Sequence, residues 1–499
     1  MKIGEFFNKL IPAVSVSRLI FENLKEKAPI KRIDEIAKTT NGGTPLRNTP
    51  EFWDGEIPWL NSGQLKDGVI KSYDQTITEQ GLKKSSAKKF PQGTLLVAMY
   101  GATVGKVGII DFESATNQAV CAIFPDQKIL RDYLYWFLRQ KRFDYLNESF
   151  GGAQPNISQK VIKVTEVPVP DLEIQEEIVT CLNEIEASQK ARPLYHYPEI
   201  DAEVSKIISH RKNYDTILKS FGNQLEQISY LRQTILQEAI QGKLTQEWRK
   251  ANPDVEPADQ LLERIQKEKQ RLIEEKQIKK EKPLPPVTEE EKPFPLPEGW
   301  VWCRLQNYFD VRDGTHETPK YKDEGIPLVT SKNLYTGKLD LVNCKFISKE
   351  DHEKISNRSK VDKYDIIFGM IGTIGNPVIV DFEPNFSIKN VALIKYFDIN
   401  LVVPQFLLYF LKSISESLKM RADGGVQSFV SLKKIRELAI PVPPLKEQKA
   451  IAEKVDQLMN YCDELESRVK QSQTHAEQLM EAVLKEVFEG EEEADQVMT

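Results

Sequence analysis

Two stretches of twenty residues decide the architecture of this chain. They read GGAQPNISQKVIKVTEVPVP at residues 151–170 and GGVQSFVSLKKIRELAIPVP at residues 424–443. Both run from a Gly-Gly-x-Gln passage to a Pro-x-Pro end, and the second begins 273 residues after the first. One spacing shared by separate motifs indicates an internal repeat.

The repeat extends upstream of these stretches. IPWLNS at residues 57–62 recurs as IPLVTS at 326–331, and MYGATVG at 99–105 recurs, one residue shorter, as MIGTIG at 370–375. Short β-branched runs separated by Gly-rich turns accompany these motifs in both halves, which predicts mixed α/β domains.

The repeat also extends downstream, with a different spacing. Leu231–Gly242 resembles Leu479–Gly490 at an offset of 248 residues, so the first copy carries about 25 extra residues, which we place at Ala191–Lys212. Pro193 and Pro198 predict that this insert is a loop or a broken helix.

A long helix follows the Pro-x-Pro end in each half. Apolar residues recur at heptad spacing in both helices, and helices at equivalent places in a repeat are expected to pack against each other. The residues predicted to form this packing are Ile174, Ile178, Leu182, Ile185, Phe221, Leu225, Ile228, Ile235, Ile451, Val455, Leu458, Leu465, Val469, Leu479 and Val483.

Two segments connect the halves. The run of mixed charges at Glu263–Lys282 predicts a solvated helix. Lys282–Pro297 holds six prolines and predicts a semi-rigid linker.

Composition excludes several classes of protein. The 499 residues are 40% hydrophobic and 28% charged, which excludes collagen-like and wholly disordered chains. The longest apolar stretch, Leu401–Leu411, contains Pro404 and falls short of the roughly 20 residues of a membrane helix, so we expect no membrane partner. Five cysteines without a CxxC motif favour a reducing cytoplasm and no bound metal.

The charge is unevenly distributed. Residues 31–170 hold 18 Lys and Arg against 15 Asp and Glu, and residues 300–443 hold 20 against 17, whereas the whole chain has a net charge of −6. The two mildly basic domains suit binding to a polyanion. The acidic helical remainder suits a scaffold that binds proteins.

Motifs for catalysis are missing. Gly101–Val107 resembles a phosphate loop, but it has one residue too few between its glycines and lacks the Ser or Thr that binds Mg²⁺, so we interpret it as a tight turn. The sequence has neither a Gly-x-Ser-x-Gly elbow nor the Asn-Pro-Pro-aromatic segment that holds a flipped adenine. Duplicated domains without duplicated catalytic residues indicate recognition, so the chain is not expected to be an enzyme.

Four passages carry a resemblance to a known family. They are Leu236–Gln246, Pro257-Ala258, Leu261–Ile265 and Leu296–Trp300. Together with the repeat, they resemble the specificity subunit of type I restriction-modification systems, and the resemblance covers nearly the whole chain after about residue 30. Residues 1–29 have no counterpart in the second half; Leu19–Lys27 is expected to form a helix on the scaffold.

The resemblance implies an α+β fold with a pseudo-two-fold internal repeat. Two target recognition domains are joined by two long antiparallel helices that form a coiled coil. Each domain reads one half of a split double-stranded DNA target, and the helices set the distance between the halves. Two methyltransferase subunits and two restriction subunits dock on this scaffold. S-adenosylmethionine, ATP and Mg²⁺ are expected on those partners and no cofactor on this chain.

The predicted domain boundaries follow from the repeat. They are an N-terminal extension at 1–30, a first target recognition domain at 31–170, a central helical spacer at 171–248, a charged helix and Pro-rich linker at 249–298, a second recognition domain at 299–443, a distal helical spacer at 444–490 and an acidic tail at 491–499.

Candidate DNA-binding residues lie in the repeated loops and in clusters of basic residues. For any single cluster, ordinary solvated surface is the competing interpretation. The candidates are Asn41, Gly43, Thr44, Asn61, Gln64, Lys66, Lys83, Lys84, Lys88, Lys89, Gln154, Asn156, Ser158, Arg312, Thr315, His316, Lys320, Lys332, Asn333, Arg358, Lys360, Gln427, Ser428, Ser431 and Lys433. Gln154 and Gln427 either contact bases or cap a helix.

Two other functions remain open. One is the recognition subunit of another multisubunit restriction system, whose partner fuses methyltransferase and nuclease. The other is a coiled-coil adaptor that binds only protein; a gel shift on duplex DNA with and without a methyltransferase partner would discriminate it.

Overall fold

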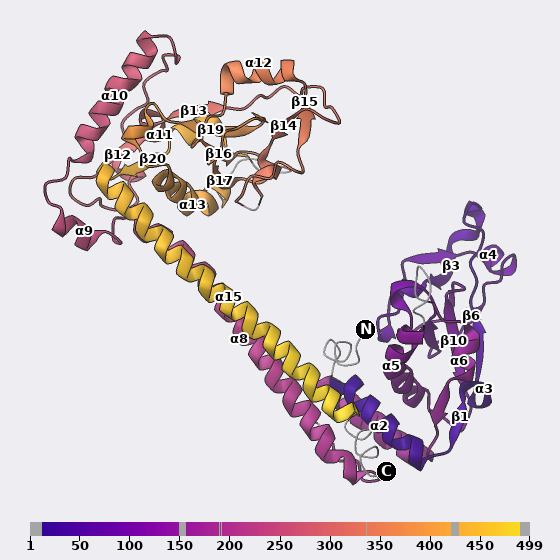
Figure 1. The fold of residues 1–499 in the computed structure, drawn as a ribbon. Coiled ribbons are helices and arrows are strands. Elements are labelled where there is room, and N and C mark those ends of the chain that lie inside the picture. Colours follow the sequence, from indigo (N-terminus) through magenta and orange to yellow (C-terminus); the bar gives the residue numbers. More distant parts are fainter. Residues whose placement is uncertain are drawn as a thin grey trace. The chain divides into compact units, whose positions relative to one another are not determined.

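The computed structural model describes residues 12–148, 156–188, 190, 192–335, 337–420 and 429–489. The chain divides into two compact units (Figure 1). Unit 1 comprises residues 1–222 and 470–499, and unit 2 comprises residues 223–469.

The described part of unit 1 contains three sheets. Their strand orders are β2-β10-β7-β8-β4, β5-β3-β9-β6 and β1-β11. The strands are β1 (Ile30–Arg32), β2 (Ala37–Asn41), β3 (Trp53–Leu60), β4 (Gly68–Ile70), β5 (Gln75–Ile77), β6 (Lys89–Phe90), β7 (Leu95–Ala98), β8 (Val107–Ile110), β9 (Ser114–Thr116), β10 (Val120–Pro125) and β11 (Glu166–Pro168). The helices are α2 (Pro12–Lys27), α3 (Ile33–Ile36), α4 (Glu79–Lys83), α5 (Arg131–Glu148), α6 (Gln159–Val164), α7 (Leu172–Ser188) and the first part of α8 (Asp201–Ile240).

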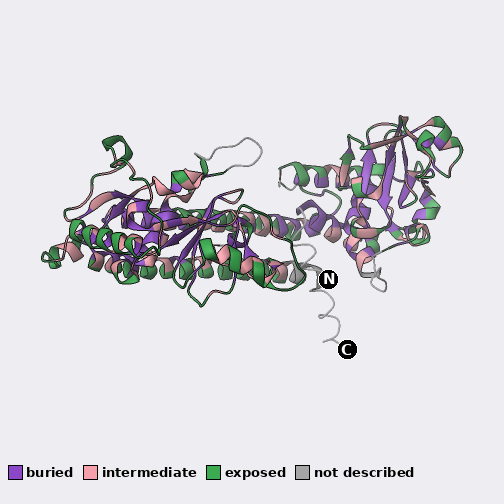
Figure 2. Cartoon of the chain, turned by 90° about the horizontal axis from the view of Figure 1, so that it is seen from above, coloured by how far each residue is buried: buried purple, intermediate pink, exposed green. Residues whose placement is uncertain are grey.

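The central strands of unit 1 are buried on both faces. Alternate side chains of a strand point to opposite sides of a sheet. Leu95 and Val97 of β7 therefore pack in the same core as Trp136 of α5, while Leu96 packs in a second core with Leu60 of β3. Helices thus cover one side of the five-stranded sheet, and the four-stranded sheet covers the other; Figure 2 shows these strands as buried.

Unit 2 follows the same plan. Its sheets have the orders β13-β19-β16-β17, β15-β14-β18 and β12-β20. The strands are β12 (Val301–Arg304), β13 (Asp310–Asp313), β14 (Ile326–Val329), β15 (Lys345–Ile347), β16 (Ile366–Gly369), β17 (Gly375–Ile379), β18 (Ser387–Ile388), β19 (Val391–Lys395) and β20 (Ala439–Val442). The helices are α9 (Gln246–Ala251), α10 (Ala258–Glu274), α11 (Leu305–Tyr308), α12 (Lys349–Ser359), α13 (Pro404–Met420), α14 (Leu432–Arg436) and the first part of α15 (Leu445–Glu489).

The internal repeat is visible in the strand order. The series β2-β10-β7-β8 corresponds to β13-β19-β16-β17, β5-β3-β9 corresponds to β15-β14-β18, and β1-β11 corresponds to β12-β20. The two-stranded sheets, β1-β11 and β12-β20, are both antiparallel. Each pairs a strand from the start of its domain with a strand from the end of that domain. The mixed α/β fold predicted for each half is therefore confirmed, with β4 and β6 as additions to the first copy.

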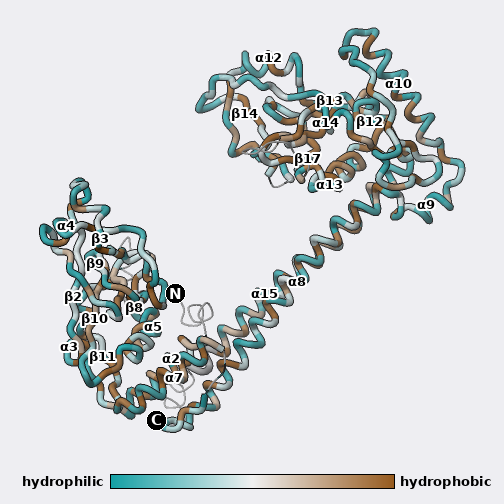
Figure 3. Tube along the Cα trace, turned by 180° about the vertical axis from the view of Figure 1, so that it is seen from behind, coloured by the Kyte–Doolittle hydropathy of each residue, from teal (hydrophilic) through white to brown (hydrophobic). Residues whose placement is uncertain are grey.

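The two long helices pack antiparallel within unit 2. Ile235 of α8 shares an apolar cluster with Ile451 and Val455 of α15. Arg232 of α8 forms ion pairs with Asp463 (2.5 Å) and Glu466 (3.1 Å) further along α15. Figure 3 shows hydrophobic and hydrophilic residues alternating along both helices, as the predicted seam requires.

The predicted seam needs two corrections in its later part. The side chains of Leu465 and Leu479 are 44% and 67% exposed, whereas Met480 is 5% exposed and packs in the core of unit 1. Met480, four residues after Ala476, therefore occupies the seam position that was predicted for Leu479. A straight helix has 3.6 residues per turn, so its apolar face drifts against a strict heptad. Phe221, Leu225, Leu458, Val469 and Val483 are half-buried.

The first half of the predicted helix pair is divided between two helices. Ile174, Ile178, Leu182 and Ile185 belong to α7, which is separate from α8. They pack in the core of unit 1 with α2 and α5, and this core also includes Val204 and Ile207 of α8 and Met480 of α15. The insert at Ala191–Lys212 breaks the chain between α7 and α8, but it is helical from Asp201 onward.

The helix predicted near the N-terminus begins at Pro12 instead of Leu19. Its Phe21 ring makes edge contacts with Tyr133 and Phe137 of α5 at 5.0 and 5.1 Å between centroids. Arg18 forms an ion pair with Asp144 of α5 at 2.9 Å.

The segments between the halves are less solvated than predicted. α10 buries Leu261, Ile265 and Leu272 against unit 2, and its Lys269 Nζ donates to Gln306 O at 2.9 Å. These apolar residues are four and seven positions apart and so lie on one face of the helix, which makes the charged run amphipathic. Likewise, the buried Arg304 binds the carbonyls of Pro285 and Pro286 and holds the Pro-rich linker on the domain.

Candidate nucleic-acid interface

The first loop of each domain begins with the same backbone anchors. After β2, Gly42 N donates to Val120 O at 3.3 Å and Gly43 N donates to Thr116 O at 2.8 Å. A Cβ at Gly43 would lie 2.3 Å from Ser86, so the loop needs a glycine for this close packing. Gly43 is buried, so its predicted role at the DNA surface is corrected to a structural one.

The second domain repeats these anchors with other residues. After β13, Gly314 N donates to Val391 O and Thr315 N donates to Ile388 O, both at 3.0 Å. The two loops therefore leave their sheets at the same place. Their side chains differ from this point on, beginning with Thr44 in the first domain and His316 in the second.

A second repeated loop follows β3 and β14. Asn61 caps the short helix η2 (Ser62–Gln64): its Oδ1 accepts from Gly63 N, and its N–H donates to Gln64 Oε1. In the second domain Thr330 N donates to Asn333 Oδ1 at 2.9 Å at the start of η6 (Ser331–Leu334).

The candidate Asn333 is corrected to a structural residue. It is 6% exposed, its Oδ1 also accepts from the Thr330 hydroxyl, and its Nδ2 donates to Asn343 O. Its amide therefore fixes the loop that carries the exposed Lys332. Asn61 and Gln64 remain half-exposed beside the exposed Lys66.

The two repeated loops meet a third one, the turn before β10 or β19. Thr44 Oγ1 donates to Gln118 Oε1 in the first domain. In the second domain the His316 ring lies 3.3 Å from Asn390 Oδ1 at the equivalent place, and its other nitrogen lies 2.8 Å from Asp313 Oδ2. One loop-to-loop contact is thus built twice from different side chains.

Arg358 joins this group through the same carboxylate. Its guanidinium forms an ion pair with Asp313 Oδ1 at 2.5 Å, and Asp313 itself is 9% exposed. The candidates Arg358, Thr315 and His316 are therefore brought together. Arg312 forms an ion pair with Asp310 at 2.6 Å, and its guanidinium also donates to Arg358 O at 3.5 Å.

The ends of the repeated Gly-Gly stretches also lie beside these loops. Ile157 N donates to Met99 O in the first domain, and Val430 N donates to Met370 O in the second. Asn156 is exposed at this place. Gln154, Gln427 and Ser428 lie outside the described residues.

Ser158 and Ser431 have a clear structural role. Ser158 Oγ accepts from Val161 N at 3.3 Å at the start of α6, and Ser431 Oγ accepts from Lys434 N at 3.2 Å at the start of α14. Both are helix N-caps, which accounts for their repetition.

We therefore expect S158A and S431A each to lower the free energy of unfolding by about 1 kcal/mol, because an N-cap bond is lost. Hydrogen exchange of α6 and α14 measures this. Ser205 is exposed inside α8, and S205A is the matched control that should lose no stability. A changed DNA target in S158A, without lost protection, would contradict the capping role.

The basic candidates are exposed, and several are paired. Ion pairs join Lys89 to Glu113 at 2.7 Å, Lys360 to Asp362 at 3.1 Å and Lys433 to Glu437 at 3.8 Å, while Lys88 donates to Thr40 Oγ1. Lys83, Lys84 and Lys320 are exposed as well. Their contact with DNA stays a prediction.

Arg47 is not among the DNA-binding candidates that were predicted from the sequence. Its guanidinium lies over the rings of Trp53 and Trp59, at 4.8 and 5.2 Å from their centroids. The sequence offered only a weak signal, an arginine shortly before two tryptophans, because nothing in the spacing shows that β3 folds back under the loop.

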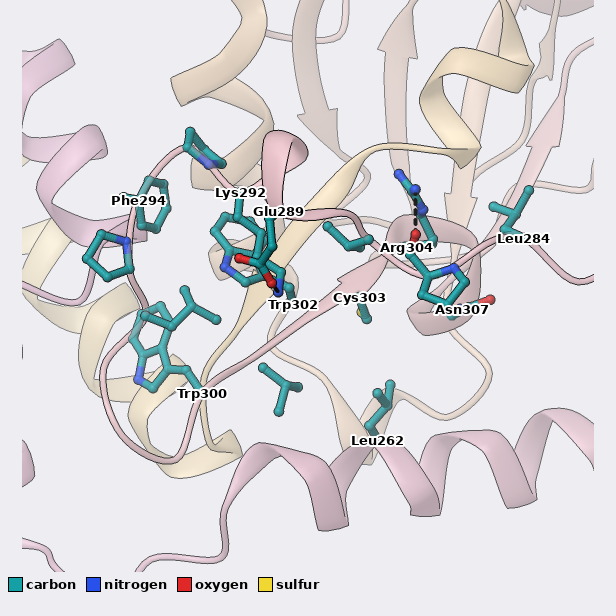
Figure 4. Close-up of a pocket in the computed structure, with 16 residues that line it drawn as sticks. Leu262, Leu284, Glu289, Lys292, Phe294, Trp300, Trp302, Cys303, Arg304 and Asn307 are labelled. Atoms are coloured by element: carbon teal, nitrogen blue, oxygen red, sulfur yellow. Dashed lines mark hydrogen bonds and ion pairs between the residues drawn. The ribbon is translucent and has the colours of Figure 1, made fainter.

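One hollow of unit 2 lies beside the Pro-rich linker, away from the loops. A cavity of about 970 Å³ separates the Pro-rich linker from β12, and Leu262, Phe294, Trp302 and Arg304 are among its lining residues (Figure 4). Arg304 forms an ion pair with Glu291 of the linker at 2.7 Å, and this hydrogen bond lowers the pKa of the Glu291 carboxyl to about 2. The contacts here hold the linker.

The described residues contain neither a membrane-spanning helix nor a metal-binding cluster. No helix within the described ranges is long and apolar enough to cross a membrane. Among the same residues, no group of three or more His, Cys, Asp or Glu side chains is placed to hold a metal ion.

Comparison with known proteins gives the family context. The family model described as "Type I restriction modification DNA specificity domain" matches the chain twice, at residues 25–192 and 297–473. The EcoAI specificity subunit of Escherichia coli is 32% identical over 288 residues, 55% of this chain and 47% of that relative. The EcoBI specificity subunit of Escherichia coli is 22% identical over 94% of this chain and 81% of the relative.

The first curated relatives are matched over about half of their length or less. Among solved structures, the HsdS subunit from Thermoanaerobacter tengcongensis is similar over 93% of this chain and 96% of that chain, with 16% identity and a TM-score of 0.39.

Proposed function

The chain belongs to the type I restriction modification DNA specificity family, and on this premise we propose that it reads a split duplex DNA target, one half-site per domain. The observation that carries the proposal is the duplicated loop cluster. Both domains present loops on identical backbone anchors, but with different side chains. A common frame with exchangeable side chains is what two readers of unlike sequences require.

The polar groups in these loops suit base recognition. In the major groove each base pair presents its own pattern of donors and acceptors, which Arg, Lys, Asn, Gln and Thr side chains can match. Phosphates are held by lysines and backbone amides, which position the protein without reading sequence. Because Thr44 and Gln118 face each other where His316 and Asn390 do in the second domain, we expect the two half-sites to differ.

The helix pair is the proposed scaffold for partners. We infer that two methyltransferase subunits and two restriction subunits assemble on the chain in the cytoplasm. S-adenosylmethionine, ATP and Mg²⁺ then belong to those partners, and the present chain contributes recognition without catalysis. The net acidic charge outside the two domains supports a protein-binding scaffold.

An exchange of domains tests this function. Replacing residues 31–170 by the matching domain of a relative should change one half of the methylated sequence and leave the other half unchanged. The exchange is feasible because the segment begins and ends on paired strands: Lys31 lies opposite Val167. The relative should retain aromatic residues at positions 133 and 137, which pack on Phe21.

The readout is the methylated sequence of a random duplex library, with the chain in complex with its methyltransferase partner. The reciprocal exchange of residues 300–443 is the matched control and should change only the other half. Both halves changing together, or neither, would show that the domains are not separate readers.

A further inference from the structure

The loop that follows β2 is held by two indole groups. Trp59 Nε1 donates to Gly43 O at 3.0 Å and Trp53 Nε1 donates to Leu46 O at 3.1 Å. The two rings pack edge to face, 5.2 Å apart at 84°. The backbone of residues 43–46 is therefore fixed at both ends, and it carries Arg47 directly beyond the second bond.

Arg47 is restrained without being neutralised. Its guanidinium lies on the two tryptophan rings, and its side chain is exposed. Stacking on an aromatic face restricts the motion of a guanidinium. Its N–H groups point outward in the plane of the guanidinium itself, so they stay free to donate. Within the described residues no hydrogen bond or ion pair occupies these donors.

Other arginines of the same domain are used differently. Arg32 pairs with Asp34, Arg131 with Asp132, and Arg139 with Glu186. Those guanidinium groups are committed to carboxylates of the protein. Arg47 instead keeps its donors for a ligand, at the end of the domain where the repeated loops gather.

The chemistry of the ligand follows from this arrangement. A planar fork of parallel donors matches two neighbouring acceptors, and the O6 and N7 atoms of guanine form such a pair in the major groove. A phosphate also accepts a fork, but phosphate contacts need no fixed orientation within the groove. The double clamp on the loop favours the base, because orientation is what the clamp provides.

We propose that Arg47 reads a guanine in the half-site recognised by the first domain. The proposal rests on the function proposed above and names one residue that determines its specificity. Among the described residues of the second domain this arrangement has no copy: the equivalent loop places His316 on Asp313 and Asn390. The effect of Arg47 is therefore confined to one half-site.

The test uses the full chain in complex with its methyltransferase partner on a random duplex library. The wild-type complex defines the target first. R47A should then accept other bases at one G·C position of one half-site, with a loss of discrimination of about 10- to 100-fold there. R47K, which keeps the charge but loses the planar fork, should relax the same position.

R131A is the matched control, because Arg131 is an exposed arginine of the same domain paired with Asp132; its target should equal that of the wild type. Uniformly weaker methylation of all sequences by R47A, with a smaller salt dependence, would mean a phosphate contact and overturn base reading. An unchanged target in both variants would overturn it too. If the wild-type complex methylates no split target, the proposed function itself fails.

Discussion

Replacing Glu447 by alanine is expected to lower the free energy of unfolding of unit 2 by about 3–5 kcal/mol. The Glu447 side chain is 1% exposed in the first turn of α15. It accepts from Thr245 Oγ1 at 2.6 Å and Trp300 Nε1 at 2.8 Å, and it forms an ion pair with Arg249. Alanine would leave a half-buried cation and two buried donors without their shared acceptor.

This carboxylate joins three segments that are distant in the sequence. Arg249 also donates to Gly242 O at 2.7 Å, and a Cβ at Gly242 would lie 2.7 Å from Pro297. The end of α8, the end of the linker and the start of α15 therefore meet at one buried point. Losing Glu447 should loosen the attachment of both long helices to the second domain.

Hydrogen exchange of residues 223–240 and 445–469 in the full chain measures the loss. E453A is the matched control, because Glu453 is exposed on the same helix; surface substitutions of this kind usually change stability by less than about 0.5 kcal/mol. If the hydrogen exchange of these helices is the same in E447A and in E453A, the buried network is not what holds them on the domain.

Glu447 also shows where sequence reasoning ends. Within the segment LKEQK it looks like one more charge on a solvated helix, and its burial depends on Thr245, Arg249 and Trp300, which lie up to about 200 residues away. The position is not marked by the repeat either, because residue 174 in the first copy is an isoleucine. Local pattern carries no information on such contacts.

Features that occur in both copies of the repeat were predictable from the sequence. Repetition identified the two domains, the Gly-Gly stretches and the loops, because each copy supports the interpretation of the other. Gln175 and Gln448 are examples: both are buried, and each donates to the carbonyl of a proline at the Pro-x-Pro end. Their recurrence reflects this structural bond.

Roles within the loops were harder to predict. Ser158 and Asn333 are polar residues of the kind that contact DNA, but Ser158 caps α6 and Asn333 accepts from the N-cap residue of η6. The same donors and acceptors serve both purposes. Arg47 was missed because a single arginine has no periodicity. The burial of Met480 in place of Leu479 was not predicted, because a fixed heptad pattern does not account for a drift of one residue along a long helix.

Lengthening both long helices by one heptad should change the target itself. We expect the gap between the half-sites to lengthen while both half-sites stay the same. Seven residues add about 10 Å to a helix, or about three base pairs at 3.4 Å per step. A tilt of the helices against the DNA reduces this number without changing its sign.

The structure decides where the insertions belong. Arg232 faces Asp463 and Glu466, so the position opposite Glu466 lies just before Arg232. A copy of residues 460–466 placed after Glu466 and a copy of residues 225–231 placed after Leu231 would face each other. Both copies preserve the phase of the seam and the Arg232 ion pairs.

Phase and length can be separated by a second double insertion. Three residues at the same two places rotate the continuing helices by about 60° against the seam, so this variant should lose specific methylation altogether. The heptad variant should instead methylate a new, wider target in the same library. A heptad variant that still methylates the original gap would mean that the spacing is set elsewhere, because a scaffold longer by about 10 Å could not hold two rigid readers at the old separation.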